Sequence, residues 1–517
     1  MLHKWKAADG GGCASVAGGV DQRRRCVAAS LSMLIAATLA FLAYVAFFPD
    51  DGAGGVYRLW RCQDCGGELG EFPGDEADAA DGPSAPRVPR EPTTLSHVVF
   101  GIGASARTWD QRRGYAELWW RPDQMRGHVW LDEQPVSPWP AATCPPYRVS
   151  ADASRFGDRA SASRMARIVA DSFLAVTAEL GNDTARREVR WFVMGDDDTV
   201  FFPDNLVAVL QKYDHEELYY VGAPSESVEQ DVMHSYGMAF GGGGFAVSYP
   251  AAAALAKAID GCLDRYALFY GSDQRVQACL SELGVPLTRE PGFHQVDIRG
   301  DAYGMLAAHP VAPLVSLHHL DHIEPISPRG KTALDAVAPL VSASRLDPAR
   351  TLQQSFCYQR GPGYEWSVSV AWGYTVQLYP WAVAPHQLEV PLQTFRTWRS
   401  WADGPFVFNT RPLKPRDACA RPAMFFLSRA RNETARTTVT EYARHAPPTP
   451  PAEKECDRAS FRAASTVHMV KVIAPRMSEG DWRRAPRRQC CKTKRTRWGS
   501  VLEVRIRRCG RGELTSP

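Results

Sequence analysis

The chain has 517 residues, and at roughly 100–200 residues per domain this length predicts two or three domains. Hydrophobic residues make up 45% of it and charged residues 23%, which excludes a disordered, collagen-like or polytopic membrane protein. The formal net charge is only +3, from 60 Lys and Arg against 57 Asp and Glu. Nucleic-acid-binding proteins usually concentrate positive charge far more heavily, so we expect no nucleic acid among the partners.

An uncharged run over residues 26–48 is long enough to cross a bilayer as one helix. Three arginines precede it at 23–25, and clustered arginines stay on the cytoplasmic side. We therefore expect a cytosolic tail (1–25), a signal-anchor helix (26–48) and a lumenal remainder. The alternative is a cleaved signal peptide, whose apolar region would span about 7–15 residues and end at a small-residue cleavage site. This run instead ends in Phe47-Phe48-Pro49.

Eleven of the 13 cysteines follow the predicted anchor. In an oxidising lumen most of them should pair, and the odd count should leave one unpaired. The pair Cys62 and Cys65 suggests a zinc knuckle or a redox motif as an alternative, but no second ligand pair stands at metal-site spacing. Residues 49–94 are rich in proline and acidic residues and lack apolar periodicity, which predicts an extended stem.

From His97 onward, short apolar strands alternate with amphipathic helices. The expected elements are strands at 97–102, 128–131 and 190–194 and helices over about 109–119 and 165–180. This alternation predicts an α/β domain with a mainly parallel sheet flanked by helices, whose ligand crevice lies at the carboxyl ends of the strands. Residues 340–517 differ, because 366–379 alternates like one half-buried strand with a bend at Gly373 and six cysteines follow residue 340. We expect a second, β-rich, disulfide-linked unit there.

The segment Gly195-Asp196-Asp197-Asp198-Thr199 directly follows the strand predicted at 190–194. Three adjacent carboxylates repel one another unless a cation or hydrogen-bond donors hold them. A hard divalent ion that also binds a diphosphate relieves this repulsion. An acidic turn or helix N-cap is the alternative, since Asp is common in both. The position after a buried strand of an α/β domain favours the metal site.

The segment 191–200 (WFVMGDDDTV) resembles the acidic strand-end motif of the fringe-like β-1,3-glycosyltransferases. Further segments carry the likeness in the family's order: 100–106 with 118–122, 240–248, 270–275 and 317–322, while 372–374 and 408–412 match only the plant-type branch. The resemblance spans about residues 95–510. It implies a GT-A-like catalytic domain over 95–335, followed by a smaller β-rich unit over 340–517, in a single-pass type II protein of the Golgi membrane.

The resemblance also implies an activity. Such an enzyme is a Mn²⁺-dependent inverting glycosyltransferase of the Golgi lumen that uses a UDP-sugar donor. It transfers a hexose or N-acetylhexosamine to a glycan or glycoprotein acceptor in a β-1,3 linkage. The sequence names neither the sugar nor the acceptor, because a few pocket contacts decide both.

By the same resemblance, Asp198 corresponds to the carboxylate that binds the metal and His318 to the second metal ligand. Asp-plus-His ligation suits Mn²⁺, which accepts oxygen ligands and tolerates imidazole. Asp196 and Asp197 correspond to the residues that face the ribose and the diphosphate. The neighbouring His319 and His322 leave open which of the three histidines is the ligand, and packing at a strand end is the alternative role for each.

Asp273 aligns with the family's catalytic carboxylate. An inverting transfer is a single displacement, in which one base takes the proton of the acceptor hydroxyl while the nucleotide leaves. A second carboxylate acting as nucleophile, as a retaining double displacement needs, is not singled out by the sequence. Helix capping is the alternative role, because Ser272 and Asp273 begin an expected helix.

Weaker donor-binding candidates are Gly243, Gly244, Ser105 and Arg113. The run of four glycines at 241–244 lacks the Lys-Ser/Thr of a phosphate loop, so it is either a flexible turn or, as the resemblance implies, a close backbone approach to the sugar. Ser105 and Arg113 are expected near the nucleotide, Arg113 because a cation there favours a diphosphate. Either could equally be a surface residue on the first helix.

Two rival functions remain open. A non-catalytic lumenal protein that kept the fold would bind glycans or act as a scaffold. A metallohydrolase built on His318, His319, His322 and the acidic triplet would hydrolyse a substrate without a nucleotide.

Overall fold

A computed structural model describes residues 91–517, apart from 414–417, 446–455, 479, 484–485 and 497–498. The predicted anchor (26–48), most of the predicted stem and Cys62 with Cys65 lie outside the described residues. Within the described part of the chain, no helix combines the length and apolar character needed to cross a membrane. The chain from Pro89 onward forms one compact unit.

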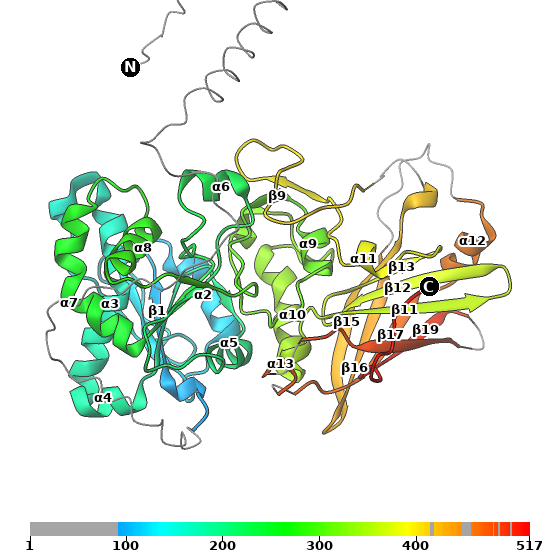
Figure 1. Ribbon diagram of the computed structural model, residues 1–517, viewed down its shortest axis with the longest axis horizontal. Helices are drawn as coiled ribbons and strands as arrows, with labels where there is room; N and C mark the ends of the chain where they lie inside the picture. Colours follow the sequence, from blue (N-terminus) through cyan, green and yellow to red (C-terminus); the bar gives the residue numbers. More distant parts are fainter. Residues whose placement is uncertain (1–90, 414–417, 446–455, 479, 484–485, 497–498) are drawn as a thin grey trace, which may run out of the picture. The chain divides into compact units, whose positions relative to one another are not determined.

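The first part of this unit is built on a seven-stranded sheet (Figure 1). Its strands, in the order in which they lie side by side, are β3 (Tyr147–Val149), β2 (Arg126–Leu131), β1 (Val98–Gly103), β4 (Trp191–Asp196), β7 (Phe245–Ser248), β6 (Tyr220–Gly222) and β8 (Leu287–Arg289). Strands β3, β2, β1 and β4 are parallel, and so are β6 and β8. Only β7 runs antiparallel to both neighbours. The sheet is therefore mixed and mostly parallel, as expected.

Successive residues of a strand point to opposite faces of the sheet, so this sheet has two apolar faces. Helices cover both of them. Along β1, Val98, Phe100 and Ile102 enter one core and Val99 enters the other. The helices of this part are α2 (Trp109–Trp119), α3 (Ala160–Leu180), α4 (Asn182–Glu188), α5 (Pro203–Leu210), α6 (Val228–Met233), α7 (Tyr249–Arg265), α8 (Ser272–Glu282), α9 (Tyr303–Ala307) and α10 (Ala333–Leu346). Helices α3, α7 and α8 pack together on the Val99 face, and α2 and α5 pack on the other (Figure 1).

The predicted strands and helices of this part are confirmed. The helix expected over 165–180 is the C-terminal three-quarters of α3, which ends before Gly181. The strand expected at 190–194 is β4, and it runs into Asp196. All six residues of β1 are buried, as a strand between two covered faces requires.

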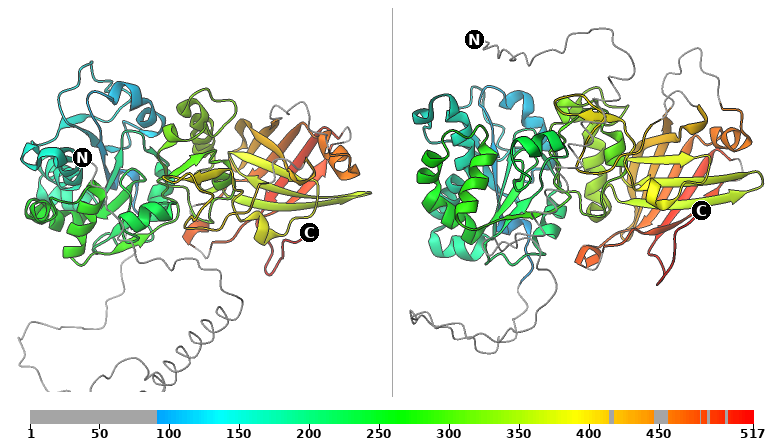
Figure 2. Two further views of the ribbon diagram at one scale, coloured as in Figure 1. Left: turned by 90° about the horizontal axis from the view of Figure 1, so that it is seen from above. Right: turned by 45° about the horizontal axis from the view of Figure 1, so that its top comes forward.

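The C-terminal part is an eight-stranded sheet, drawn in yellow to red in Figure 2. Its strands in spatial order are β11 (Gln354–Gly361), β12 (Tyr364–Ala371), β13 (Thr375–Tyr379), β15 (Ala423–Thr434), β16 (Thr437–His445), β17 (Met469–Pro475), β19 (Val501–Arg507) and β18 (Cys490–Arg495). The short helices α11 (Pro385–Leu388), α12 (Ala459–Ser465) and α13 (Gly480–Arg483) lie between strands in the sequence. The expected β-rich unit is confirmed.

One element of this sheet differs from the expectation. Residues 366–379 are not one bent strand: β12 and β13 form a hairpin in which Ala371 pairs with Thr375. The turn between them uses Gly373 in the left-handed region, with φ 80°. The alternation of side chains continues through the turn in the sequence, so the reversal of direction is not visible in the pattern.

Four disulfides link the described cysteines: Cys262–Cys279, Cys357–Cys491, Cys419–Cys456 and Cys490–Cys509. Cys144 is buried and free, so most of the described cysteines pair and one is left over, as predicted. Cys357 lies on β11 and Cys491 on β18, the two edge strands of the eight-stranded sheet. This disulfide therefore joins the two edges, which limits the exposure of unpaired strand edges.

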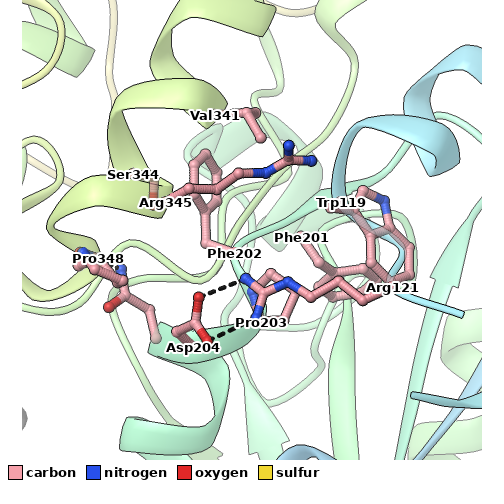
Figure 3. A pocket seen from close by; sticks show the side chains of 11 residues that line it. Trp119, Arg121, Phe201, Phe202, Pro203, Asp204, Val341, Ser344, Arg345 and Pro348 are labelled. Atoms are coloured by element: carbon pink, nitrogen blue, oxygen red, sulfur yellow. Dashed lines mark hydrogen bonds and ion pairs between the residues drawn. The ribbon is translucent and has the colours of Figure 1, made fainter. Parts of the chain in front are cut away.

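Helix α10 joins the two parts, because it packs against both α2 and β15. The predicted boundary between residues 335 and 340 falls within this helix. Figure 3 shows the junction, where the guanidinium of Arg121 binds both carboxylate oxygens of Asp204 at 2.5 and 2.9 Å. Arg345 of α10 donates a hydrogen bond to the carbonyl oxygen of Leu118. The remaining cavity of about 10 Å³ holds at most one water molecule, so the junction is closely packed.

Candidate active site

The acidic triplet lies in a turn that hydrogen bonds fix in place. The backbone N–H of Asp196 donates to Oγ1 of Thr199 at 2.8 Å, and Thr199 Oγ1 donates to the carbonyl oxygen of Gly242 at 2.7 Å. The indole N–H of Trp119 donates to the carbonyl oxygen of Thr199 at 3.0 Å. The turn is thus anchored both to helix α2 and to the glycine loop 241–244, which fixes the direction of its carboxylates.

A short strand pair brings His318 to the triplet. Strand β10 (Ser316–Leu317) pairs antiparallel with β5 (Val200–Phe201), which directly follows the triplet in the chain. Nε2 of His318 consequently lies 3.0 Å from Oδ1 of Asp198 and 3.7 Å from Oδ2 of Asp196. The ligand atoms of Asp196, Asp198 and His318 all lie within 4.8 Å of one another.

This group fits a divalent cation. Two carboxylates and one imidazole are ligands that Mn²⁺ and similar ions accept. Oδ1 of Asp198 is buried and faces Nε2 of His318 at 3.0 Å, while the buried Nδ1 of His318 makes no hydrogen bond with the described residues. Buried carboxylates are costly unless opposite charge or donors surround them, and a bound cation would supply that charge at Asp198.

The pKa shifts show that the three aspartates are not equivalent. Burial raises the pKa of Asp196 well above its usual range, and the charges of Asp198 and Asp273 add to the shift. Burial likewise raises the pKa of Asp197 to about 6, against the hydrogen bond from Arg112. Burial also disfavours ionised Asp198, but the hydrogen bond and charge of His318 outweigh it and lower the pKa of this carboxyl. Ionising all three aspartates together is therefore costly unless a cation lies beside them.

The cation beside the triplet is Arg112 rather than the predicted Arg113. Nη1 of Arg112 lies 3.0 Å from Oδ1 of Asp197 and 3.4 Å from Oδ2 of Asp198. Nη1 of Arg113 instead lies 3.3 Å from Oε1 of Glu117, one helical turn further along α2. Consecutive helix residues point about 100° apart, so a shift of one position moves the charge away from the site.

A signal for Arg112 exists in the sequence. It shares one helix face, at spacings of three and four residues, with Trp109, Ala116 and Trp119, which α2 buries. A cation on the face that packs toward the sheet needs a buried partner, and the triplet provides it.

The glycine loop lies between the two other predicted site residues. A Cβ atom added to Gly241 would fall 2.7 Å from Oδ1 of Asp273, and one added to Gly242 would fall 2.1 Å from Cε1 of His318. The two glycines thus allow both side chains to pack against the loop backbone. This close packing favours a role in shaping the site over that of a flexible turn. Gly243 and Gly244 are buried, Gly243 beside Gln295 and Gly244 against Phe201, so their contact with a donor stays a prediction.

Asp273 lies in the first turn of α8, where a carboxylate is favoured by the helix dipole. Its Oδ1 accepts a hydrogen bond from the Ser272 hydroxyl at 2.8 Å. Because it touches Gly241 and acts electrostatically on Asp196, it lies at the same site as the triplet and His318. The N-cap of α8 is Gly271, so Asp273 is not the capping residue, and its contacts place it at the site.

The arrangement of these residues agrees with comparisons to known families. A family model described as "Protein of unknown function, DUF604" matches residues 230–491, about half of the chain, and a model described as "Fringe-like" matches residues 150–303. The chain belongs to the fringe-like glycosyltransferase family. The Fringe-like match contains the triplet and Asp273, and the DUF604 match contains His318. No curated protein matches the chain.

In this fringe-like glycosyltransferase, the structure separates the three clustered histidines. Only His318 contacts the aspartates of the triplet closely. His319 has a left-handed backbone (φ 52°), its Nδ1 lies 2.9 Å from Oδ1 of Asp297, and its ring stacks on Trp398 at a centroid distance of 4.7 Å. The rings of His318 and His319 lie 3.9 Å apart, so His319 supports the histidine beside the triplet. The ring of His322 makes T-shaped contacts with the rings of His319 and Trp398.

Trp398 shows that the C-terminal region contributes to the site of this glycosyltransferase. It follows β14 (Phe395–Thr397), which pairs antiparallel with β9 (Ile298–Gly300). The guanidinium of Arg299 lies over the Trp398 ring at 3.8 Å and donates to its carbonyl oxygen at 3.2 Å. The sequence gives no sign of this contact, because about 80 residues separate Trp398 from His319.

Ser105 lies just beyond the carboxyl end of β1. Its hydroxyl donates to Oδ2 of Asp132 at 2.9 Å, while the N–H of Ala106 donates to Oδ1 at 2.8 Å. Arg164 of α3 donates to the carbonyl oxygens of Ala104 and Trp130 at 3.1 and 3.0 Å, and it interacts electrostatically with Asp196 and Asp197. Neither Arg164 nor Asp132 is marked by a pattern in the sequence. Contact of Ser105 with a nucleotide stays a prediction.

Proposed function

We propose that the chain is a Mn²⁺-dependent inverting glycosyltransferase that uses a UDP-sugar donor. The observation that carries the proposal is that His318, distant in the chain, joins Asp196 and Asp198 in a metal-type ligand group, while Asp273 meets the same glycine loop. The first three would hold the ion, which when bound would neutralise the diphosphate of the donor. The family supports glycosyl transfer in general, and the metal, donor and mechanism are our proposal.

The residues of the chain have distinct roles in this proposal. Asp273 takes the proton of the acceptor hydroxyl as the acceptor oxygen bonds to the anomeric carbon and the bond from that carbon to UDP breaks. Arg112 and Arg164 provide positive charge beside the carboxylates, where a diphosphate would bind. His319, held by Asp297 and Trp398, orients the ring of His318.

We also propose a β-1,3 linkage, a hexose or N-acetylhexosamine as the transferred sugar, and a glycan or glycoprotein acceptor. The location is proposed to be the Golgi lumen, with the chain anchored as a type II membrane protein by residues 26–48. Four disulfides support an oxidising compartment. Two glycosylation motifs stand in the sequence, Asn182-Asp183-Thr184 and Asn432-Glu433-Thr434. The asparagine of each is exposed, as attachment of a glycan requires.

A donor screen tests the function. The full chain, purified in detergent with Mn²⁺, is incubated with glycan acceptors and UDP-galactose, UDP-glucose, UDP-N-acetylglucosamine or UDP-xylose, and the UDP and the products are quantified. One donor should yield a glycosylated product. Asp273→Asn should lower turnover at least about 100-fold while UDP still binds. The matched control is Asp183→Asn, which alters the same position of the first turn of α4 and should leave turnover unchanged.

Three outcomes would contradict the proposal or one of its parts. A chain that binds no UDP-sugar in the presence of Mn²⁺ would favour the glycan-binding or scaffold function. Hydrolysis of a substrate without any nucleotide would favour the metallohydrolase. Full turnover by Asp273→Asn would remove Asp273 as the base.

A further inference from the structure

A pocket of about 380 Å³ lies behind the candidate active site. It begins at the carboxyl ends of β6 and β8 and is bounded on its other side by C-terminal residues, including Val407, Phe408 and Arg488. This volume is in the range of sites that bind small molecules. The pocket at the α10 junction, at about 10 Å³, is far too small for a ligand.

The lining of this pocket is mainly apolar. Its apolar side chains include Ala223, Phe293, Met305, Ala308, Val407 and Phe408. About a dozen water molecules would fill such a space, since each takes about 30 Å³. They would find few polar partners in this lining. An apolar molecule that displaces this water gains the free energy of burying its own surface and that of the walls.

The titratable groups of the wall satisfy one another. Nδ1 of His309 lies 2.8 Å from the carbonyl oxygen of Pro310, so it must carry the proton of that ring. Nε2 of His309 then accepts from Nε2 of His294 at 3.0 Å, and Nδ1 of His294 donates to Oε1 of Glu226 at 3.0 Å. All four ring nitrogens of His294 and His309 are therefore engaged by these contacts. Burial and the charge of His294 lower the pKa of His309 to about 3, in agreement with a neutral ring.

Most of the other charged groups of the lining have polar partners, although Nε of Arg488 is buried and makes no hydrogen bond with the described residues. Arg488 lies 2.8 Å from Glu389, and Glu290 lies 2.8 Å from Lys212. Arg289 is exposed and donates to the carbonyl oxygen of Tyr236 at 2.7 Å. An anion at Arg488 would have to compete with the carboxylate of Glu389, whereas a neutral apolar ligand displaces only water.

The pocket is separated from the candidate active site by one layer of backbone. The carbonyl oxygen of Ala223 accepts from the N–H of Phe240, the residue before the glycine loop. The carbonyl oxygen of His294 accepts from the N–H of His318 at 3.1 Å. The pocket and the candidate active site thus lie against the same backbone segments, but different side chains line them.

We propose that this pocket is a second ligand site that binds a neutral, mainly apolar small molecule with an aromatic ring. The volume sets the size of the ligand, and the mainly apolar lining favours a neutral molecule over a charged one. The side chains of Phe293 and Phe408 favour a ring, which can pack edge-to-face against them. The inference does not depend on the proposed function, because none of these residues belongs to the ligand group of Asp196, Asp198 and His318.

Titration of the full chain with indole, followed by ligand-observed NMR, tests this inference. Benzoate and glucose serve as charged and polar comparison probes. Indole should bind saturably and at least 10-fold more tightly than either comparison probe. Val407 is 47% exposed at the pocket, so Val407→Asp should fold normally and weaken indole binding at least 10-fold. Val232→Asp changes a valine that is 69% exposed on α6 and does not line the pocket, so it should leave binding unchanged.

A second pair of variants fills the space itself. Ala308→Trp should abolish indole binding, while Ala178→Trp, on the exposed face of α3, should not change it. Equal indole affinity in the wild type, Val407→Asp and Ala308→Trp would overturn the proposal. Absence of saturable binding to the wild type, as when a segment of the chain itself fills the pocket, would overturn it as well. Tighter binding of benzoate than of indole would contradict the neutral class of ligand.

Discussion

The imidazole of His318 lies so close to the Cα of Gly242 that an added Cβ would fall 2.1 Å from its Cε1 atom. The same glycine accepts a hydrogen bond from Thr199 Oγ1 through its carbonyl oxygen. Gly242 is thus held by the turn of the triplet and packs on the histidine that completes the ligand group. A glycine is needed here because real Cβ atoms do not approach other heavy atoms this closely.

Gly242→Ala should therefore move the ring of His318 away from Asp198. We expect the affinity for Mn²⁺ to fall about 10–100-fold, the usual cost of disturbing the groups that orient a metal ligand. Isothermal titration calorimetry of the full chain with Mn²⁺ measures this change. The control is Gly237→Ala, where the nearest atom to an added Cβ is Ser235 Oγ at 3.5 Å, and its affinity should match the wild type. Equal affinity in both variants would show that the contact does not position His318.

The pair Arg112 and Arg113 tests which cation serves the nucleotide. Arg112→Ala should weaken UDP binding in the presence of Mn²⁺ about 10-fold, because a charge-assisted partner of a diphosphate is lost. Arg113→Ala should have little effect, because its guanidinium pairs with Glu117 on the surface of α2. Calorimetric titration with UDP compares the two. The reverse result, with Arg113→Ala the weaker binder, would restore the interpretation drawn from the sequence.

Trp398→Ala removes the ring on which His319 stacks. We expect the affinity for Mn²⁺ to fall several-fold to 10-fold, because His319 loses one of the two contacts that hold it beside His318. Trp398→Phe should recover part of the loss, since an aromatic face remains. Trp401→Ala is the control, as this residue is 56% exposed. An unchanged metal affinity in Trp398→Ala, with a lowered melting temperature, would give Trp398 only a structural role.

The carboxyl of Asp231 should make stability depend on pH. Burial raises its pKa to about 7, and its Oδ2 has no hydrogen-bond partner among the described residues. The folded state then binds more protons than the unfolded state between about pH 4 and 7, so stability falls as pH rises through this window. Asp231→Asn should reduce the fall, and its free energy of unfolding at pH 8, measured by urea denaturation, should exceed that of the wild type by about 1–2 kcal/mol. The exposed Asp110→Asn should keep the wild-type slope. A wild-type pH dependence of stability in Asp231→Asn would show that other groups cause it.

The sequence predicts much of this molecule because its local patterns are strong. Each of three features follows from a pattern within a short segment of the chain: the helix α3, the buried strand β1 and the acidic triplet at the end of β4. The prediction names Arg113, whereas Arg112 lies beside the triplet, because the sequence gives the type of residue but not the direction of the side chain. The hairpin at Gly373 and the stacking of Trp398 on His319 depend on contacts between distant segments, which periodicity does not encode.

The central claim is that Asp196, Asp198 and His318 bind one divalent ion. A titration of the full chain with Mn²⁺, in which free Mn²⁺ is measured by electron paramagnetic resonance, tests it most directly. The wild type should bind one ion per chain at this site. Asp198→Ala should lose at least about 100-fold in affinity, while the surface variant Asp110→Ala should titrate like the wild type. Identical titrations of Asp198→Ala and the wild type would contradict the metal site.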